Sequence, residues 1–166
     1  GTGKSTISRS VAQSLNDTSL LGASYFFRRG KKGRNSSTCL FPTIANQLMV
    51  TIPNFKEHLR ESLDKLGNTQ IETKSVGEQF KTLILTPLSQ ILTGTSERPL
   101  NRVIVIDALD ECECQDDIRL ICDQLSKLQE LHSMSLRVFL TSRSDTLIVG
   151  AFDSLKDKGI TYRGLS

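Results

Sequence analysis

The sequence lacks long apolar runs and a strong excess of either charge. No stretch among its 166 residues approaches the roughly 18–20 apolar residues that cross a membrane, so we expect a soluble chain with no membrane partner. Its formal net charge of +3 is too small to indicate a nucleic-acid partner. It has no internal repeat and no low-complexity segment. With 37% hydrophobic and 23% charged residues, the composition is that of one ordinary globular domain.

Cysteine is also scarce. The four cysteines, Cys39, Cys112, Cys114 and Cys122, suggest no disulfide framework in a chain of this size. A zinc site made of the last three and His132 would need paired ligand spacings, and Cys-x-Cys followed by gaps of seven and nine residues does not match them. We therefore expect free thiols in a reducing cytosol and a cytoplasmic location.

What the sequence does contain is half of a phosphate-binding loop. The motif G-x-x-x-x-G-K-[ST] ends in the residues that open this chain, Gly1, Thr2, Gly3, Lys4, Ser5 and Thr6. In such loops backbone N–H groups close around phosphate oxygens, the lysine reaches the β- and γ-phosphates, and the serine hydroxyl ligates Mg²⁺. The apolar spacing of residues 4–15 is helical, and a helix N-terminus favours a bound anion. Half a motif is a modest signal, because glycine turns often precede helices.

A second element strengthens this signal about 100 residues later. Four consecutive β-branched residues, Val103 to Ile106, predict a strand that is buried on both faces and leads into Asp107. A carboxylate at the C-terminal end of a parallel strand is where Mg²⁺-nucleotide lies in P-loop folds. Together the two elements predict a nucleoside triphosphate as the ligand.

Strand and helix patterns alternate along the chain, which predicts a parallel sheet covered by helices on both faces. Strands are expected at 21–27, 103–107, 136–141 and 160–165, and helices at 4–15, 40–51, 53–66, 75–92, 116–131 and 145–155. Pro42 lies in a first helical turn, where proline is tolerated, whereas Pro87 should kink its helix. The predicted fold class is α/β, with the three α-β-α layers of a P-loop NTPase.

A basic segment with two glycines, residues 28–34, follows the first predicted strand. It carries five positive charges in seven residues, RRGKKGR. Such a segment close to the sheet edge is either an anion site or a solvated loop, and the pattern favours the solvated loop.

Four segments, in this order and spacing, resemble the NACHT nucleoside triphosphatase domain of the STAND class: GTGKST, LGASYFFRRG, VIVIDALDE and VFLTSR. More narrowly, they resemble the fungal NLR-like group of heterokaryon-incompatibility proteins and the nephrocystin-3-like N-terminal domain. The resemblance covers nearly the whole chain. Its specific part is the combination of D-A-L-D-E with T-S-R.

The resemblance implies a role for each motif. Asp107 would hold Mg²⁺, directly or through water. Asp110 and Glu111 lie where a carboxylate can orient or deprotonate the attacking water, and the choice between them stays open, with Glu111 preferred. Arg143 would sense the γ-phosphate. From the residues alone, the two acids could instead be a helix cap with a first-turn acid, and Arg143 a surface salt-bridge partner.

The implied function is a regulatory switch in an NLR-like signalling protein. Bound ATP or GTP would hold a self-oligomerising state, and slow hydrolysis would restore the resting state. Effector and repeat domains would lie outside this chain. Two other function classes remain. One is a nucleotide or small-molecule kinase, which needs an arginine-bearing lid. The other is a non-hydrolysing scaffold, and the intact motif residues argue against it.

The chain departs from the family pattern in three places. The first loop glycine and the strand before the loop are absent, and Ser144 stands where a proline commonly follows the sensor arginine. There is also no initiator methionine, so we expect a piece of a longer protein. Residues 1–166 alone should bind nucleotide poorly, because half of the phosphate-binding backbone and a buried strand would be missing.

Overall fold

A three-stranded parallel sheet forms the centre of the computed structural model, which describes residues 3–91, 99–143, 149–151 and 153. The strands are β1 (Leu21–Phe26), β2 (Leu100–Asp107) and β3 (Met134–Leu140), and they lie in the order β1-β2-β3. Ile106 is paired with Tyr25 on one side and with Leu140 on the other. The carboxyl ends of all three strands therefore lie at one edge of the sheet, and β2 is central, as its apolar sequence predicts.

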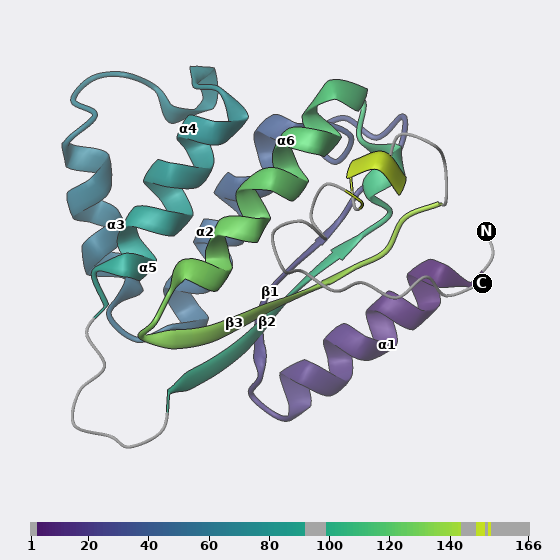
Figure 1. Cartoon of the computed structure of the whole chain (residues 1–166), viewed down its shortest axis with the longest axis horizontal. Coiled ribbons are helices and arrows are strands. Elements are labelled where there is room, and N and C mark those ends of the chain that lie inside the picture. Colours follow the sequence, from purple (N-terminus) through teal and green to yellow (C-terminus); the bar gives the residue numbers. More distant parts are fainter. Residues whose placement is uncertain (1–2, 92–98, 144–148, 152, 154–166) are drawn as a thin grey trace.

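Helices cover both faces of this sheet (Figure 1). One face carries α1 (Lys4–Asp17), which contacts β1 and β2. On the other side lie α2 (Leu40–Thr51), α3 (Phe55–Asp64), α4 (Val76–Phe80), α5 (Thr86–Ser89) and α6 (Gln115–Ser126). The predicted α/β class, a parallel sheet with helices in layers on both faces, is confirmed. No helix in the described part of the chain has the length and apolarity needed to cross a membrane.

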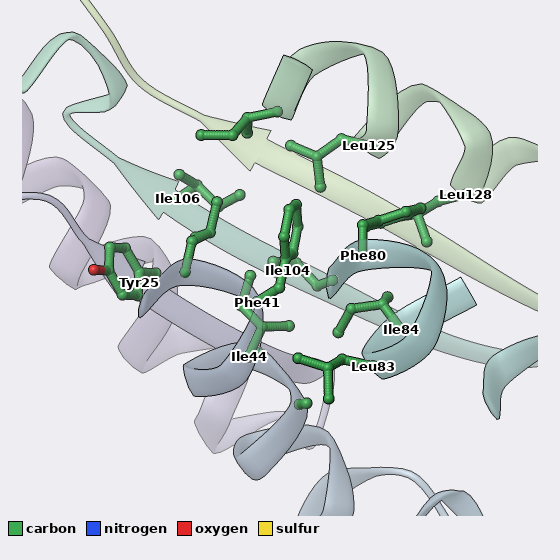
Figure 2. Packing of buried hydrophobic residues seen from close by; sticks show 14 of the residues in the cluster. Tyr25, Phe41, Ile44, Phe80, Leu83, Ile84, Ile104, Ile106, Leu125 and Leu128 are labelled. Atoms are coloured by element: carbon green, nitrogen blue, oxygen red, sulfur yellow. The ribbon is translucent and has the colours of Figure 1, made fainter. Parts of the chain in front are cut away.

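The main core lies between the sheet and the larger group of helices. Figure 2 shows Ile104 and Ile106 of β2 packed among side chains of α2, α4 and α6. Phe41 and Phe80 meet edge to face, with ring centroids 5.1 Å apart, and both are fully buried. Because strand side chains alternate, the buried Val105 points to the opposite face, where α1 lies. This packing fixes the position of the β2 end, which carries Asp107.

The predicted helix over 75–92 is interrupted by a π-helical segment. Residues Lys81–Leu85 form this segment between α4 and α5, and it ends two residues before Pro87. Proline has no N–H to donate, and its ring clashes with the carbonyl four residues earlier, which is that of Leu83. The predicted distortion is therefore present, but it precedes the proline, and α5 ends at Ser89.

Other element boundaries differ by a few residues from the predicted ones. The α3 helix begins at Phe55 rather than Pro53, because Asn54 adopts a left-handed conformation with φ of 66°. The α6 helix ends at Ser126 and continues as a 3-10 turn to Glu130. Of the predicted helix over 145–155, residues 149–151 and 153 are described and are helical. The predicted strand over 160–165 lies outside the described residues.

Candidate functional site

The start of α1 has the shape of a glycine turn that feeds a helix. Gly3 is left-handed, with φ of 77°, and its carbonyl accepts the Ile7 N–H at 3.0 Å. An added Cβ at Gly3 would meet nothing within 4 Å, so the glycine serves the turn conformation rather than close packing. Ser5 and Thr6 are exposed on the first turn. Gly1, Thr2 and the side chain of Lys4 lie outside the described residues.

Asp107 is the centre of the site. It is 1% exposed, at the end of β2, so its carboxylate depends on hydrogen-bond donors in place of water. Its Oδ1 accepts from Ser8 Oγ at 2.6 Å and from Thr141 Oγ1 at 2.5 Å. Its Oδ2 accepts from Ser5 Oγ at 2.8 Å. The structure thus brings the motif serine and the strand-end carboxylate together across 102 residues of sequence.

Ser8 and Thr141 have roles that the sequence motifs did not identify. Both donate to Oδ1, so this oxygen has two donors, whereas Oδ2 has the motif serine as its partner among the described residues. Ser8 is fully buried, one turn after Ser5. The sequence signal for Ser8 was its position: it lies at helical spacing from the apolar residues Val11, Ala12 and Leu15, so it shares their face of the helix. The two hydroxyls hold the carboxylate in one orientation, with Oδ2 toward the start of α1.

A left-handed residue turns the chain away from the sheet directly after Asp107. Ala108 has φ of 57° and ψ of 48°, an uncommon conformation for a residue with a Cβ. Hydrogen bonds to the end of the neighbouring strand hold the turn: Ala108 N–H donates to Thr141 Oγ1 at 3.0 Å, and Leu109 N–H to Thr141 O at 3.0 Å. Thr141 therefore fixes both the carboxylate and the turn that follows it. The next three residues form a 3-10 turn, Leu109–Glu111.

This turn directs Asp110 toward the end of β3. Asp110 is 9% exposed, and its Oδ1 accepts the Arg143 N–H at 3.1 Å. Its Oδ2 lies 3.6 Å from Arg143 Nε, and the Arg143 side chain is 75% exposed. The predicted sensor residue is therefore beside one of the two predicted base candidates. The contact also matches the alternative interpretation of Arg143 as a salt-bridge partner.

Glu111 contacts a different part of the molecule. Its Oε2 accepts the backbone N–H of Arg29 at 2.9 Å, in the basic segment after β1. The two adjacent acids thus diverge: Asp110 contacts the β3 end, and Glu111 contacts the segment that follows β1. Each acid accepts a backbone N–H, and Asp110 also lies close to the cationic side chain of Arg143.

The donor set at Asp107 fits magnesium. Carboxylate and hydroxyl oxygens are the ligands that Mg²⁺ takes, and this ion usually binds one or two protein groups together with water and substrate phosphates. No group of three or more His, Cys, Asp and Glu side chains that could hold a metal occurs among the described residues. Asp107 Oδ2 and Ser5 Oγ, 2.8 Å apart, would therefore supply two ligands and leave the remaining ones to a ligand and water.

The candidate site lies at the carboxyl edge of the sheet. A groove of about 570 Å³ lies elsewhere, between α4 and the end of α6, and is lined by Ser75, Gly77, Glu78, Lys81, Leu85, Gln124, Lys127 and Glu130. None of the predicted site residues lines this groove. Its lining has two lysines and two glutamates, so it carries no net charge. The chemistry of the donor groups, not this groove, identifies the candidate site.

The cysteines lie apart from the Asp107 contacts. Cys112 and Cys122 are buried, Cys39 is half-buried and Cys114 is exposed, and all four are free thiols. Burial raises the pKa of both the Cys112 and the Cys122 thiol to about 11, so both stay protonated at neutral pH. Protonated buried thiols are neither nucleophiles nor metal ligands.

Comparison with known proteins gives one family. The model of the family described as "Nephrocystin 3, N-terminal" matches residues 1–143, from the phosphate-loop motif to Arg143. No curated protein and no solved structure matches the chain.

Proposed function

The chain belongs to the nephrocystin 3 N-terminal family, and on that premise we propose that it is the nucleotide-binding part of a regulatory switch. In this proposal it binds ATP or GTP with Mg²⁺ and hydrolyses it slowly. The triphosphate state of the full-length NLR-like protein then self-associates in the cytoplasm, and the diphosphate state is at rest. The NACHT-type relationship and the fungal heterokaryon-incompatibility relationship are parts of this proposal.

The observation that carries the proposal is the contact between Ser5 and Asp107. A phosphate-loop serine and a carboxylate at the end of a central parallel strand are the two groups that Mg²⁺-nucleotide sites of this kind require. Here the two side chains are 2.8 Å apart, and the carboxylate is buried and held by Ser8 and Thr141. A helix N-terminus beside them favours phosphate.

Bound Mg²⁺ would neutralise charge on the β- and γ-phosphates and help to orient them. The protein's own groups have separate tasks. Asp107 Oδ2 and Ser5 Oγ would hold the ion, and Lys4 would bind the β- and γ-phosphates. Because Ser8 and Thr141 already orient Asp107, little rearrangement is needed before a ligand binds.

Hydrolysis needs a carboxylate that receives or orients the proton of the attacking water. Glu111 and Asp110 are the candidates, and each has a partner that would have to yield: Arg29 N–H for Glu111, Arg143 for Asp110. Arg143 is exposed and attached to the β3 end, from which it can reach a γ-phosphate at the sheet edge. A slow rate is consistent with acids that are engaged elsewhere.

A non-hydrolysing nucleotide-binding scaffold is the second candidate function. It is supported by the hydrogen bond from Arg29 N–H to Glu111 Oε2, since this contact directs the preferred base toward residues 28–34 and away from the β3 end. Single-turnover assays with radiolabelled ATP and GTP distinguish the two candidates. The switch predicts slow release of phosphate that Lys4→Ala abolishes, and the scaffold predicts binding with no release.

Calorimetry on the full-length protein tests nucleotide binding itself. Lys4→Ala should abolish triphosphate binding, whereas the matched control Lys56→Ala, an exposed lysine on α3, should bind like the unmodified protein. Asp107→Asn should lose the Mg²⁺-dependent part of the affinity and keep Mg²⁺-free binding. Unchanged affinity in Lys4→Ala would refute the phosphate-loop assignment, and equal losses with and without Mg²⁺ in Asp107→Asn would refute the metal role.

A further inference from the structure

The proposed switch does not use the basic loop formed by residues 28–34. Its cationic residues are all exposed: Arg28, Arg29, Lys31, Lys32 and Arg34. The chain has 21 Lys and Arg residues and 18 Asp and Glu residues. Without the five in this loop, acidic residues would outnumber basic ones. The positive net charge of the chain is therefore concentrated in one short loop.

Internal hydrogen bonds fix the backbone of the basic loop. Arg28 N–H donates to Arg34 O at 2.8 Å, which closes the loop at its two ends. Within it, Lys31 N–H donates to Arg28 O at 3.2 Å and Arg34 N–H to Lys31 O at 2.9 Å. Gly30 and Gly33 have φ of 74° and 85°, a conformation that glycine adopts without strain. The backbone of the loop is thus held in two turns by its own hydrogen bonds.

Two side chains attach the basic loop to the carboxyl edge of the sheet. The hydroxyl of Tyr25, in β1, donates to Gly33 O at 3.3 Å. Burial raises the pKa of Tyr25 to about 12, so this hydroxyl keeps its proton at neutral pH. On the other side, Glu111 accepts the Arg29 N–H at 2.9 Å. Both contacts use the loop backbone and leave the cationic side chains free to point outward.

The five cationic side chains of the loop have no anionic partner within the described part of the chain. None of the five forms an ion pair with a residue in the described ranges. Like charges held this close repel one another, and an anion that bridges them would relieve the repulsion. A negatively charged ligand at this loop would therefore interact favourably with several cations at once.

The surroundings of the basic loop restrict the size of that ligand. The Glu113 N–H donates to Asn35 O at 2.6 Å, so the acidic residue Glu113 lies beside the end of the loop, and Asp116 and Asp117 follow at the start of α6. A long polyanion would meet these carboxylates. Among the large hydrophobic side chains exposed in the described ranges, none is aromatic, and the half-buried Phe26 ring already lies under Arg9, with Cζ 6.0 Å from the ring centroid, which does not favour stacking of nucleic-acid bases.

We propose that residues 28–34 form a second phosphate site, separate from the proposed nucleotide site, for a small free anion with clustered phosphate groups. The five cations lie within seven residues of a loop that is closed by the Arg28–Arg34 hydrogen bond, and so many charges in so short a loop suit a ligand whose phosphates are close together. Most contacts would come from guanidinium and ammonium groups, because four of the loop's backbone N–H groups, those of Arg28, Arg29, Lys31 and Arg34, already have acceptors.

Inorganic tripolyphosphate, titrated by calorimetry in Mg²⁺-free buffer of low ionic strength, is the test. The full-length protein carries Lys4→Ala, which removes the lysine of the proposed nucleotide site. A variant with Lys31→Gln, Lys32→Gln and Arg34→Gln removes three loop charges. The matched control removes three exposed charges from α3 and its C-cap, with Lys56→Gln, Arg60→Gln and Lys65→Gln.

We expect tripolyphosphate to bind the Lys4→Ala protein, and the loop variant to bind about tenfold more weakly, roughly twofold for each exposed cation removed. The α3 control should bind like its parent, and added salt should weaken binding. Equal affinity in the loop variant, or complete loss of binding in Lys4→Ala alone, would overturn the second site. Tighter, loop-dependent binding of single-stranded RNA or of anionic vesicles would overturn the assignment to a small free anion. Failure of the nucleotide proposal leaves these results unaffected, because nucleotide binding is measured separately.

Discussion

The hydrogen bond from Ser8 to Asp107 gives a sharp test of the candidate site. Ser8→Ala removes one donor, 2.6 Å from Oδ1 of a carboxylate that is 1% exposed, and leaves the chain shape almost unchanged. A hydrogen bond to a buried charged group contributes about 1.5–3 kcal/mol. Alanine is the better helix former by about 0.5 kcal/mol, which offsets part of this loss. The net destabilisation near β2 should be about 1–2.5 kcal/mol.

Hydrogen exchange of peptides from α1 and β2, followed by mass spectrometry in the full-length protein, measures this local loss. The expected change is roughly 5- to 70-fold faster exchange, since about 1.4 kcal/mol corresponds to a factor of ten. Ser10→Ala is the matched control, because Ser10 is exposed on the same helix. It should exchange at the original rate or slightly more slowly.

A double-mutant cycle ties the effect to the carboxylate. In an Asp107→Asn background the charge is absent, so Ser8→Ala should cost about 1 kcal/mol less than in the unmodified protein. If Ser8→Ala and Ser10→Ala exchange at the same rate, the hydroxyl does not hold Asp107. If Ser8→Ala costs the same with Asp107→Asn present, its effect has another origin.

Three further predictions concern catalysis, pH and packing. Glu111→Gln should keep nucleotide binding and slow hydrolysis by ~10²–10⁴-fold in single-turnover assays; if Asp110→Asn gives this result instead, the base is Asp110. Burial raises the pKa of the Cys122 thiol from 9.0 to about 11, so the folded state favours the protonated thiol. The protonated thiol therefore contributes about 2–3 kcal/mol to the free energy of unfolding below pH 9, and this contribution is lost as the pH rises through 11. In Cys122→Ala the melting temperature should therefore fall less steeply with pH over this range. Phe80→Ala should destabilise the domain by about 3–5 kcal/mol in urea unfolding, because the Phe80 ring is fully buried. Val50 is 87% exposed, so the control Val50→Ala should change stability by less than about 0.5 kcal/mol.

Local patterns in the sequence determined the elements and their type. The β-branched run before Asp107 gave a central strand, and the glycine turn before residues 4–15 gave a helix start, because both depend on backbone preference and side-chain period within a few residues. The alternation of strands and helices predicted a parallel sheet with helices on both faces, which the structure confirms. Element ends were less accurate where single residues decide them, as at left-handed Asn54.

Only the tertiary structure decided which side chains meet at the site. Ser8 and Thr141 converge on one oxygen of Asp107 from 99 and 34 residues away, and no local pattern contains that convergence. The divergence of Asp110 and Glu111 depends on the left-handed turn at Ala108, which hydrogen bonds to the β3 end hold in place. Sequence motifs specify the kinds of groups at a sheet edge. Their orientation follows from register and packing between strands that are distant in the chain.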